Sequence, residues 1–225
     1  MSRHVRHGES AGDGFDLLVT PESAGWGFSG LRVLTLAPGA ARTIATGEDE
    51  VIVLPLEGSC TVTVDGEAFA VEGRAGIFAA VTDFVYAPRD ATVEIASERG
   101  GRFALPSARA ANRLPARHVA AEETEVELRG AGQASRQINN FCGPDVAIAD
   151  RLIAVEVLTP AGNWSSYPPH KHDEDIPARR PRSRRSTTSR SRRRPPATPA
   201  SPTSACTGRA PAGRSTSRPR SARAT

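Results

Sequence analysis

An abrupt change of composition at residue 175 limits how this chain can fold more than any other feature. The last 50 residues, 176–225, contain 14 Arg, no acidic residue and one large aliphatic side chain, Ile176. This segment, which we call the tail, cannot bury enough apolar surface to offset the entropy of ordering it, so we expect it to be disordered. A packed core must therefore form within residues 1–175, the body, which are enough for one or two domains.

The charges divide at the same place. The whole chain carries 29 basic and 25 acidic residues, a net charge of +4. Because 14 of the basic residues lie in the tail, the body has 15 basic residues against 25 acidic ones, a net charge of −10. An acidic body joined to a strongly basic tail calls for two separate interpretations.

Several classes of protein are disfavoured by the body's sequence. No run approaches the roughly 18 consecutive apolar residues that a membrane span needs, and the first residues lack the apolar stretch of a secretory signal. The three cysteines are far apart and odd in number, which disfavours a disulfide framework and suits a reducing compartment. We expect a cytoplasmic protein without a membrane partner, with Cys60 in the core and Cys142 in a turn.

Short β-rich runs separated by turn residues recur along the body, and no helical period is sustained. This pattern predicts an all-β sandwich or barrel. The expected strands are Leu31–Leu36, Val51–Leu56, Cys60–Val64, Ala68–Val71, Ile77–Val81, Phe84–Ala87, Ala91–Ala96 and Arg102–Leu105.

A second series of strands follows an expected linker near Ser107–Ala121. It comprises Glu125–Arg129, Ser135–Phe141 and Leu152–Leu158, and it can be followed only to Asp175. We therefore expect three regions: a complete barrel over 1–115, the first part of a second barrel over 116–175, and the disordered tail over 176–225. The truncation would leave apolar strand edges of the second barrel open.

The sharpest local prediction is a hairpin at Asp65-Gly66, because a two-residue Asp-Gly loop favours a type I′ turn. The turn fixes the register, and the register places one wholly apolar face on the hairpin. The predicted pairs are Cys60 with Val71, Thr61 with Ala70, Val62 with Phe69 and Thr63 with Ala68.

His170 and His172 are the candidate metal ligands. Side chains alternate along an extended strand, so two histidines separated by one residue face the same way, and Lys171 faces the other. Imidazole pairs suit Zn, Fe, Ni or Cu. A His-x-His pair also occurs in solvated turns, and the nearby Trp164 and Tyr167 could simply cover the mouth of a barrel.

The sequence around these histidines resembles a known family. The run Gly162-Asn-Trp-Ser-Ser-Tyr-Pro-Pro-His-Lys-His-Asp-Glu174 is similar to the 5-deoxy-glucuronate isomerases of myo-inositol catabolism, which are two-barrel cupins. Similar segments occur in the same order at Thr20-Pro-Glu-Ser-Ala-Gly-Trp-Gly-Phe28, Thr61-Val-Thr-Val-Asp-Gly-Glu67 and Ser135-Arg-Gln-Ile-Asn-Asn140, so the resemblance covers about residues 5–175. It implies a jelly-roll-like cupin fold.

The resemblance also implies an activity, the aldose–ketose isomerisation of 5-deoxy-D-glucuronate to 5-dehydro-2-deoxy-D-gluconate. A divalent metal (Zn, Mn or Fe) would bind His170 and His172, polarise the carbonyl and assist proton transfer between adjacent carbons. The general base and the remaining ligands should follow Asp175, where this chain departs from the family. Glu174 lies too close to His172 for the usual cupin spacing, so the catalytic residues are unknown and we expect impaired activity.

The first barrel lacks the ligand set that cupins share. Val93 occupies the position of the later ligand histidine, and no His-x-His pair precedes Glu50. We therefore expect this barrel to be metal-free and structural. Glu50 and Glu57 are predicted to be surface or turn carboxylates, because acids are seldom buried, and we expect His4, His7 and His118 to be surface histidines.

The genetic code suggests an origin for the tail. All of its residues except Ile176, 49 of 50, are encoded with C or G at the middle codon position. A GC-rich gene read in a displaced frame gives this composition, since third codon positions then become second positions. Arg184-Arg185-Ser186-Thr187-Thr188 is what Glu-Glu-Ile-Tyr-Tyr codons give when read one base late, and Arg179-Arg180 is what Glu-Glu codons give. We hypothesise a one-base slip near Asp175.

Three alternatives remain open at this point. The chain could be a non-catalytic cupin remnant, or the tail could bind nucleic acid non-specifically through its arginines. It could also be a related cupin isomerase that acts on a 4-deoxy-5-keto uronate. In the isomerase interpretation the partners are a small sugar acid and further copies of the same chain.

Overall fold

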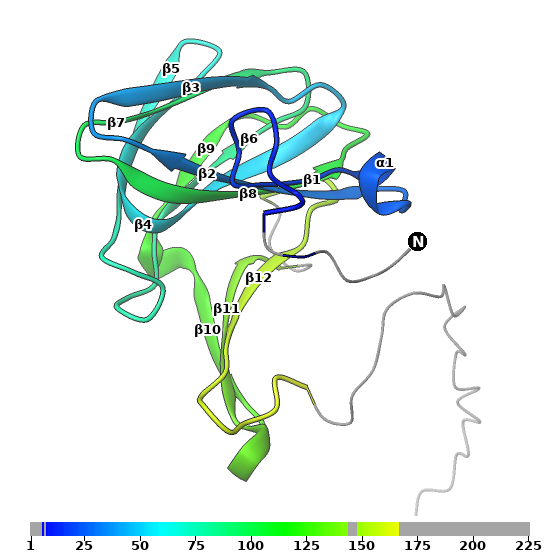
Figure 1. The fold of residues 1–225 in the computed structure, drawn as a ribbon, viewed down its shortest axis with the longest axis vertical. Coiled ribbons are helices and arrows are strands. Elements are labelled where there is room, and N and C mark those ends of the chain that lie inside the picture. Colours follow the sequence, from blue (N-terminus) through cyan, green and yellow to red (C-terminus); the bar gives the residue numbers. More distant parts are fainter. Residues whose placement is uncertain (1–5, 7, 144–147, 167–225) are drawn as a thin grey trace, which may run out of the picture. The chain divides into compact units, whose positions relative to one another are not determined.

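The computed structural model describes residues 6, 8–143 and 148–166 (Figure 1). Strands dominate this part of the chain, with one short α-helix, α1 (Pro21–Ala24), and two 3₁₀ turns. The strands are β1 (Leu17–Val19), β2 (Ser29–Leu36), β3 (Ala40–Ala45), β4 (Asp49–Val64), β5 (Glu67–Arg74), β6 (Phe84–Ala87), β7 (Thr92–Ser97), β8 (Gly101–Arg109), β9 (Arg117–Val119), β10 (Glu125–Arg129), β11 (Arg136–Cys142) and β12 (Ala154–Leu158).

Strands β1–β9 form a barrel, which we call the first barrel, organised by the long strand β4. The first half of β4 pairs with β8 and β6, in the order β1-β2-β8-β4-β6-β9, and its second half pairs with β5 and β7. Strand β3 extends this second layer through β7, and all the pairings are antiparallel. The all-β, jelly-roll-like cupin fold predicted from the sequence is confirmed.

The predicted hairpin is present with its predicted register. Val62 pairs with Phe69 and Cys60 with Val71, whereas Thr61 pairs with Ala70 on the other face. Asp65 and Gly66 have φ angles of 49° and 92°, the positive values that a type I′ turn requires at both central positions.

The space between the two layers of the first barrel is filled with aliphatic and aromatic side chains. Val53, Val62, Ile95, Phe103 and Leu105 are fully buried there. At about 25 cal/mol per Å² of buried apolar surface, such a core is the main source of stability for the barrel.

Strands β10, β11 and β12 form a second, three-stranded antiparallel sheet (Figure 1, green to yellow). One end of this sheet packs against the outer face of β4 and β6. The rings of Phe84 in β6 and Phe141 in β11 meet edge to face, with centroids 5.6 Å apart. Ile148 and Leu152 join the same apolar cluster, so a second core lies between the first barrel and the three-stranded sheet.

Some sequence predictions of local structure were wrong. Segments Val51–Leu56 and Cys60–Val64 belong to the single strand β4, and Ile77–Val81 contains a turn that exposes Phe78 instead of a strand. Strand β9 lies inside the expected linker and pairs with β6. No helix in the described part of the chain is long and apolar enough to cross a membrane.

Candidate functional site

The interior of the first barrel is lined with buried apolar side chains. Val93, at the position where the resemblance would place a ligand histidine, is completely buried among Val62, Val64 and Ile95. Across residues 6, 8–143 and 148–166, no group of three or more His, Cys, Asp or Glu side chains lies close enough to hold a metal ion.

Glu50 contradicts the prediction of a surface carboxylate, because it is completely buried where β4 meets the segment before β12. One of its oxygens accepts hydrogen bonds from the Tyr86 hydroxyl (2.9 Å) and the Asp150 amide (2.8 Å). The other accepts from the amides of Arg151 and Leu152, both at 2.6 Å. Four donors therefore satisfy this carboxylate, which is how a buried acid is tolerated. Glu57, by contrast, is exposed as predicted.

The Glu50 cluster also affects two neighbouring groups. Burial and then the hydrogen bond to Glu50 raise the pKa of Tyr86 well above its ordinary value. Burial, with the charge of Glu50, raises the pKa of the Cys142 thiol to about 12. Cys142 ends β11 as a buried residue, not in the expected turn, and neither it nor the buried Cys60, whose pKa burial also raises to about 12, is a nucleophile near neutral pH.

A buried ion pair makes a second link between the first barrel and the three-stranded sheet. The Arg74 side chain is fully buried and donates to both carboxylate oxygens of Glu156 in β12, at 2.9 and 2.6 Å. Its Nε donates to the Pro55 carbonyl (3.0 Å), and Asn139 Nδ2 donates to Glu156 (2.8 Å). Bidentate geometry and extra hydrogen bonds are what a buried ion pair needs.

His118 also has a partner that its sequence context did not reveal. Its Nε2 lies 2.9 Å from an oxygen of the buried Asp83, and the amides of Glu72 and Gly73 donate to the same carboxylate at 2.9 and 2.8 Å. Burial alone would raise the pKa of Asp83, but these hydrogen bonds outweigh it and lower that pKa below its ordinary value. The prediction that His118 is a simple surface residue is therefore wrong.

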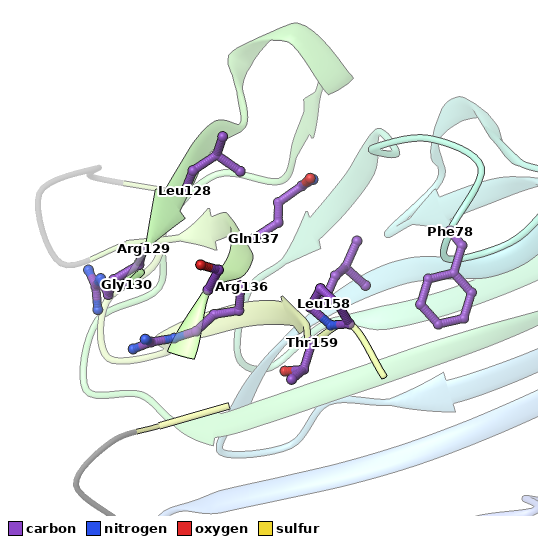
Figure 2. Close-up of a pocket in the computed structure, with 10 residues that line it drawn as sticks. Phe78, Leu128, Arg129, Gly130, Arg136, Gln137, Leu158 and Thr159 are labelled. Atoms are coloured by element: carbon purple, nitrogen blue, oxygen red, sulfur yellow. The ribbon is translucent and has the colours of Figure 1, made fainter. Parts of the chain in front are cut away.

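A cavity of about 460 Å³ lies at the end of the β10–β11 hairpin (Figure 2). Leu128, Leu158, Pro160 and the exposed Phe78 give it apolar walls. Its other lining residues are polar, charged or glycine: Arg129, Gly130, Ser135, Arg136, Gln137 and Thr159.

The predicted metal ligands His170 and His172 lie outside the described residues, as do Tyr167, Lys171 and Glu174. The segment that leads to them is described as far as residue 166, and it folds back on the hairpin. The Trp164 amide donates to the Gln133 carbonyl (2.7 Å), and Asn163 Nδ2 donates to the Ser135 carbonyl (2.8 Å). The start of the family-like run therefore passes beside the cavity, while the Trp164 side chain is half exposed.

Comparison with known proteins gives consistent matches. The model of the KduI/IolB family matches residues 4–187. A 5-deoxy-glucuronate isomerase of Geobacillus kaustophilus is 38% identical over 159 residues, 70% of this chain, and one of Geobacillus thermodenitrificans is 37% identical over 177 residues, 77% of this chain. The chain spans only 57% and 64% of the lengths of these two relatives.

A solved structure agrees with these matches. The crystal structure of an IolB-like protein from Salmonella typhimurium LT2 superposes with a TM-score of 0.69 at 30% identity. The superposition covers 75% of this chain and 65% of the other.

Proposed function

This chain belongs to the KduI/IolB family, and we propose that it is a 5-deoxy-glucuronate isomerase by descent, impaired in the form given by its sequence. The observation that carries the proposal is the identity of 37–38% with two isomerases over at least 70% of this chain. The run that precedes and includes His170 and His172 adds specific support, because it resembles the same family residue by residue.

The proposed reaction is an internal proton transfer. A base removes the proton from C2 of the open-chain aldehyde, a proton is delivered to C1, and the proton of the C2 hydroxyl passes to the C1 oxygen. C1 becomes a hydroxymethyl group and C2 a ketone, so no external oxidant or reductant is needed. A divalent metal (Zn, Mn or Fe) would supply a Lewis acid for the carbonyl oxygen.

His170 and His172 are the proposed holders of that metal. Two neutral imidazoles fit such an ion chemically, but two ligands alone make a weak site. The resemblance places the remaining ligands after Asp175, where this chain departs from the family pattern. We therefore propose low metal affinity and little or no turnover.

Metal content and turnover test this function directly. Purified protein loaded with Zn, Mn or Fe is dialysed and its metal content measured, and isomerisation of 5-deoxy-D-glucuronate is followed with and without a chelator. Weak, His170-dependent metal binding with slow, chelator-sensitive turnover supports the proposal. Metal retention that is unchanged in His170→Gln/His172→Gln, or turnover that resists chelation, contradicts it.

The same proposal includes the regions expected from the sequence, a complete barrel over 1–115, the beginning of a second barrel over 116–175 and a tail over 176–225, although strand β9 (Arg117–Val119) of the first barrel lies just past the first boundary. It also includes a one-base slip near Asp175. Sequencing the gene tests the slip. We expect the neighbouring frame after Asp175 to encode an acidic Glu-Glu-Ile-Tyr-Tyr strand. A chain with the frame restored should bind metal tightly and turn over substrate. The absence of family-like sequence in that frame would refute the slip.

The 14 arginines of the tail favour a second candidate function, non-specific binding of nucleic acid. It predicts binding that weakens steeply with salt and disappears when residues 176–225 are deleted. A chain with neither activity would be a non-catalytic cupin remnant. We further propose a cytoplasmic location and association with copies of itself, which fractionation and sedimentation would test.

A further inference from the structure

We propose that Arg136 binds the carboxylate of a small sugar acid in the cavity at the end of the β10–β11 hairpin. The inference rests on the proposed function for the identity of the ligand.

Arg136 is a partly buried cation with unused hydrogen-bonding capacity. Its Nη1 donates to the Ala134 carbonyl (3.0 Å), but its Nε is buried and has no hydrogen-bond partner in the described part of the chain. No carboxylate among those residues forms an ion pair with it, although the body as a whole is acidic. A buried donor without a partner is costly. Arg136 also lines the cavity, and its Nη2 makes no hydrogen bond within the described residues, so the guanidinium can still donate to an acceptor placed there.

The neighbouring Arg129 differs from Arg136 in having a carboxylate partner. It pairs with Arg136 in the antiparallel register, and in Figure 2 the two side chains extend to the same side of the hairpin. Both carboxylate oxygens of Glu127 accept hydrogen bonds from Arg129, at 2.8 and 2.6 Å. The Arg129 hydrogen bond, with weaker help from the charges of Arg129 and Arg136, lowers the pKa of Glu127. Arg129 is thus already neutralised, whereas Arg136 has no such bond.

The backbone of the hairpin loop packs closely against the Arg136 guanidinium at Gly130. Gly130 has a φ of +85°, and a Cβ placed on it would lie 2.1 Å from the Ala134 carbonyl oxygen and 3.0 Å from Arg136 Nη1. Only glycine fits there, because both the backbone angle and the contact exclude a side chain. The cavity beside this loop has the size typical of small-molecule sites.

The remaining lining suits a sugar acid better than a plain anion. Ser135, Gln137 and Thr159 offer hydroxyl and amide groups that can hydrogen-bond to sugar hydroxyls, and Phe78 and Pro160 offer apolar surface for the C–H face of a sugar. An arginine fork matches a carboxylate with two parallel hydrogen bonds. A hexuronate combines these three features, whereas a neutral sugar lacks the carboxylate.

The experiment is equilibrium binding of D-glucuronate to the full chain, measured by calorimetry. We expect binding at millimolar concentrations, weakened at least about tenfold in Arg136→Gln, since a lost charge-assisted pair costs more than about 1.4 kcal/mol. Arg129→Gln should change affinity much less, and Glu127→Gln should strengthen binding because it frees Arg129. Arg102→Gln, an exposed arginine of the first barrel, is the matched control and should bind as the parent does.

The outcomes separate this inference from the proposed function. Equal affinity of Arg136→Gln and the parent, equal binding of neutral methyl glucoside, or no binding of glucuronate would each overturn the carboxylate site. If Arg136→Gln lowers the melting temperature, the comparison moves to Glu127→Gln, whose failure to raise affinity would overturn it equally. Absence of metal and of turnover, with Arg136-dependent binding intact, would refute the isomerase and leave the site standing.

Discussion

The first barrel and the three-stranded sheet bury their apolar side chains in different ways. The first barrel encloses its own core between two layers, with Val53, Ile95 and Phe103 fully buried. The three-stranded sheet encloses no core of its own. Its apolar side chains Leu128, Val155 and Val157 are 80%, 49% and 41% exposed.

Because of this difference, the three-stranded sheet depends for its stability on packing against the first barrel. Three strands become stable when one face packs against something apolar, and here that support is the outer face of β4 and β6, through Phe84 and Phe141. The hydrogen bonds of Glu50 and the ion pair of Arg74 also connect the first barrel to the three-stranded sheet. We call this set of contacts between the two regions the junction. The barrel should therefore survive loss of the sheet, whereas the sheet should not survive loss of the barrel.

Removing one buried aromatic ring from each core tests this difference between the two regions, and we expect the largest effects from these substitutions. Phe103→Ala should lower the free energy of unfolding by about 4 kcal/mol and melt both regions, because a large buried ring is lost from the barrel. Phe141→Ala should instead release the three-stranded sheet and leave the barrel folded. Urea unfolding combined with limited proteolysis distinguishes the two variants. A barrel that unfolds together with the sheet in Phe141→Ala would contradict the asymmetry.

Removing Arg74 should have the next largest effect. Arg74→Ala leaves Glu156 partly buried with only Asn139 as partner, so we expect a loss of about 3 kcal/mol in the stability of the junction. The double variant Arg74→Ala/Glu156→Ala should recover part of this loss, since it removes the unpaired charge. Hydrogen exchange of β11 and β12 amides measures the effect. A single variant that costs no more than a surface ion pair, about 1 kcal/mol or less, would show that the link is unimportant.

The two regions also differ in how far their sequence predicts them. The Cys60–Val71 hairpin was predicted to the residue, because Asp65-Gly66 fixes the turn and side-chain alternation fixes the face. Strand β3 was missed because its sequence, Ala-Ala-Arg-Thr-Ile-Ala, carries little apolar bias, and only alternate residues are partly buried. Ile77–Val81 has the composition of a strand, yet it lies in a turn with Phe78 81% exposed.

The junction could not have been predicted at all. Glu50 is satisfied by amides 100 to 102 residues away, and Arg74 by a carboxylate 82 residues away. Neither partner follows from local sequence, because a buried acid and a buried arginine have no periodic signature. The prediction from base rates, that acids stay at the surface, was right for Glu57 and wrong for Glu50. The His-x-His spacing alone makes His170 and His172 weak candidates for metal ligands, and the resemblance to a family adds the support that spacing cannot give.

Glu50→Gln tests the hydrogen bonds between the first barrel and the segment before β12, and we expect a smaller loss of stability. Each oxygen of Glu50 accepts at least one backbone N–H, so the amide nitrogen of glutamine must face a backbone donor whichever way it turns. We expect a loss of about 2 kcal/mol, with faster hydrogen exchange at Arg151 and Leu152. Glu57→Gln, on the same strand but exposed, is the matched control and should change stability little. Equal effects of the two variants would mean that Glu50 does not hold the junction.

The smallest expected effect is a pH dependence confined to the barrel. Asp83 has a lowered pKa in the folded chain, so its contribution to stability is complete above its unfolded-state pKa of about 3.9 and is lost as the pH falls through the lower, folded value. The difference in unfolding free energy between the parent and Asp83→Asn should therefore shrink as the pH falls below about 4.

Urea unfolding of the parent, of Asp83→Asn and of Asp16→Asn, an exposed aspartate of the same barrel, tests this dependence. Because Asp83 accepts its hydrogen bonds from His118 in β9 and from the end of β5, its protonation should loosen the barrel's own sheet edge. The junction made by Glu50 and Arg74 involves neither group. If acid instead released β10–β12 in Asp83→Asn and the parent alike, before any change at β9, the carboxylates of the junction would be the acid-sensitive groups. The barrel would then be the more acid-resistant of the two regions, as its enclosed core already makes it the more stable.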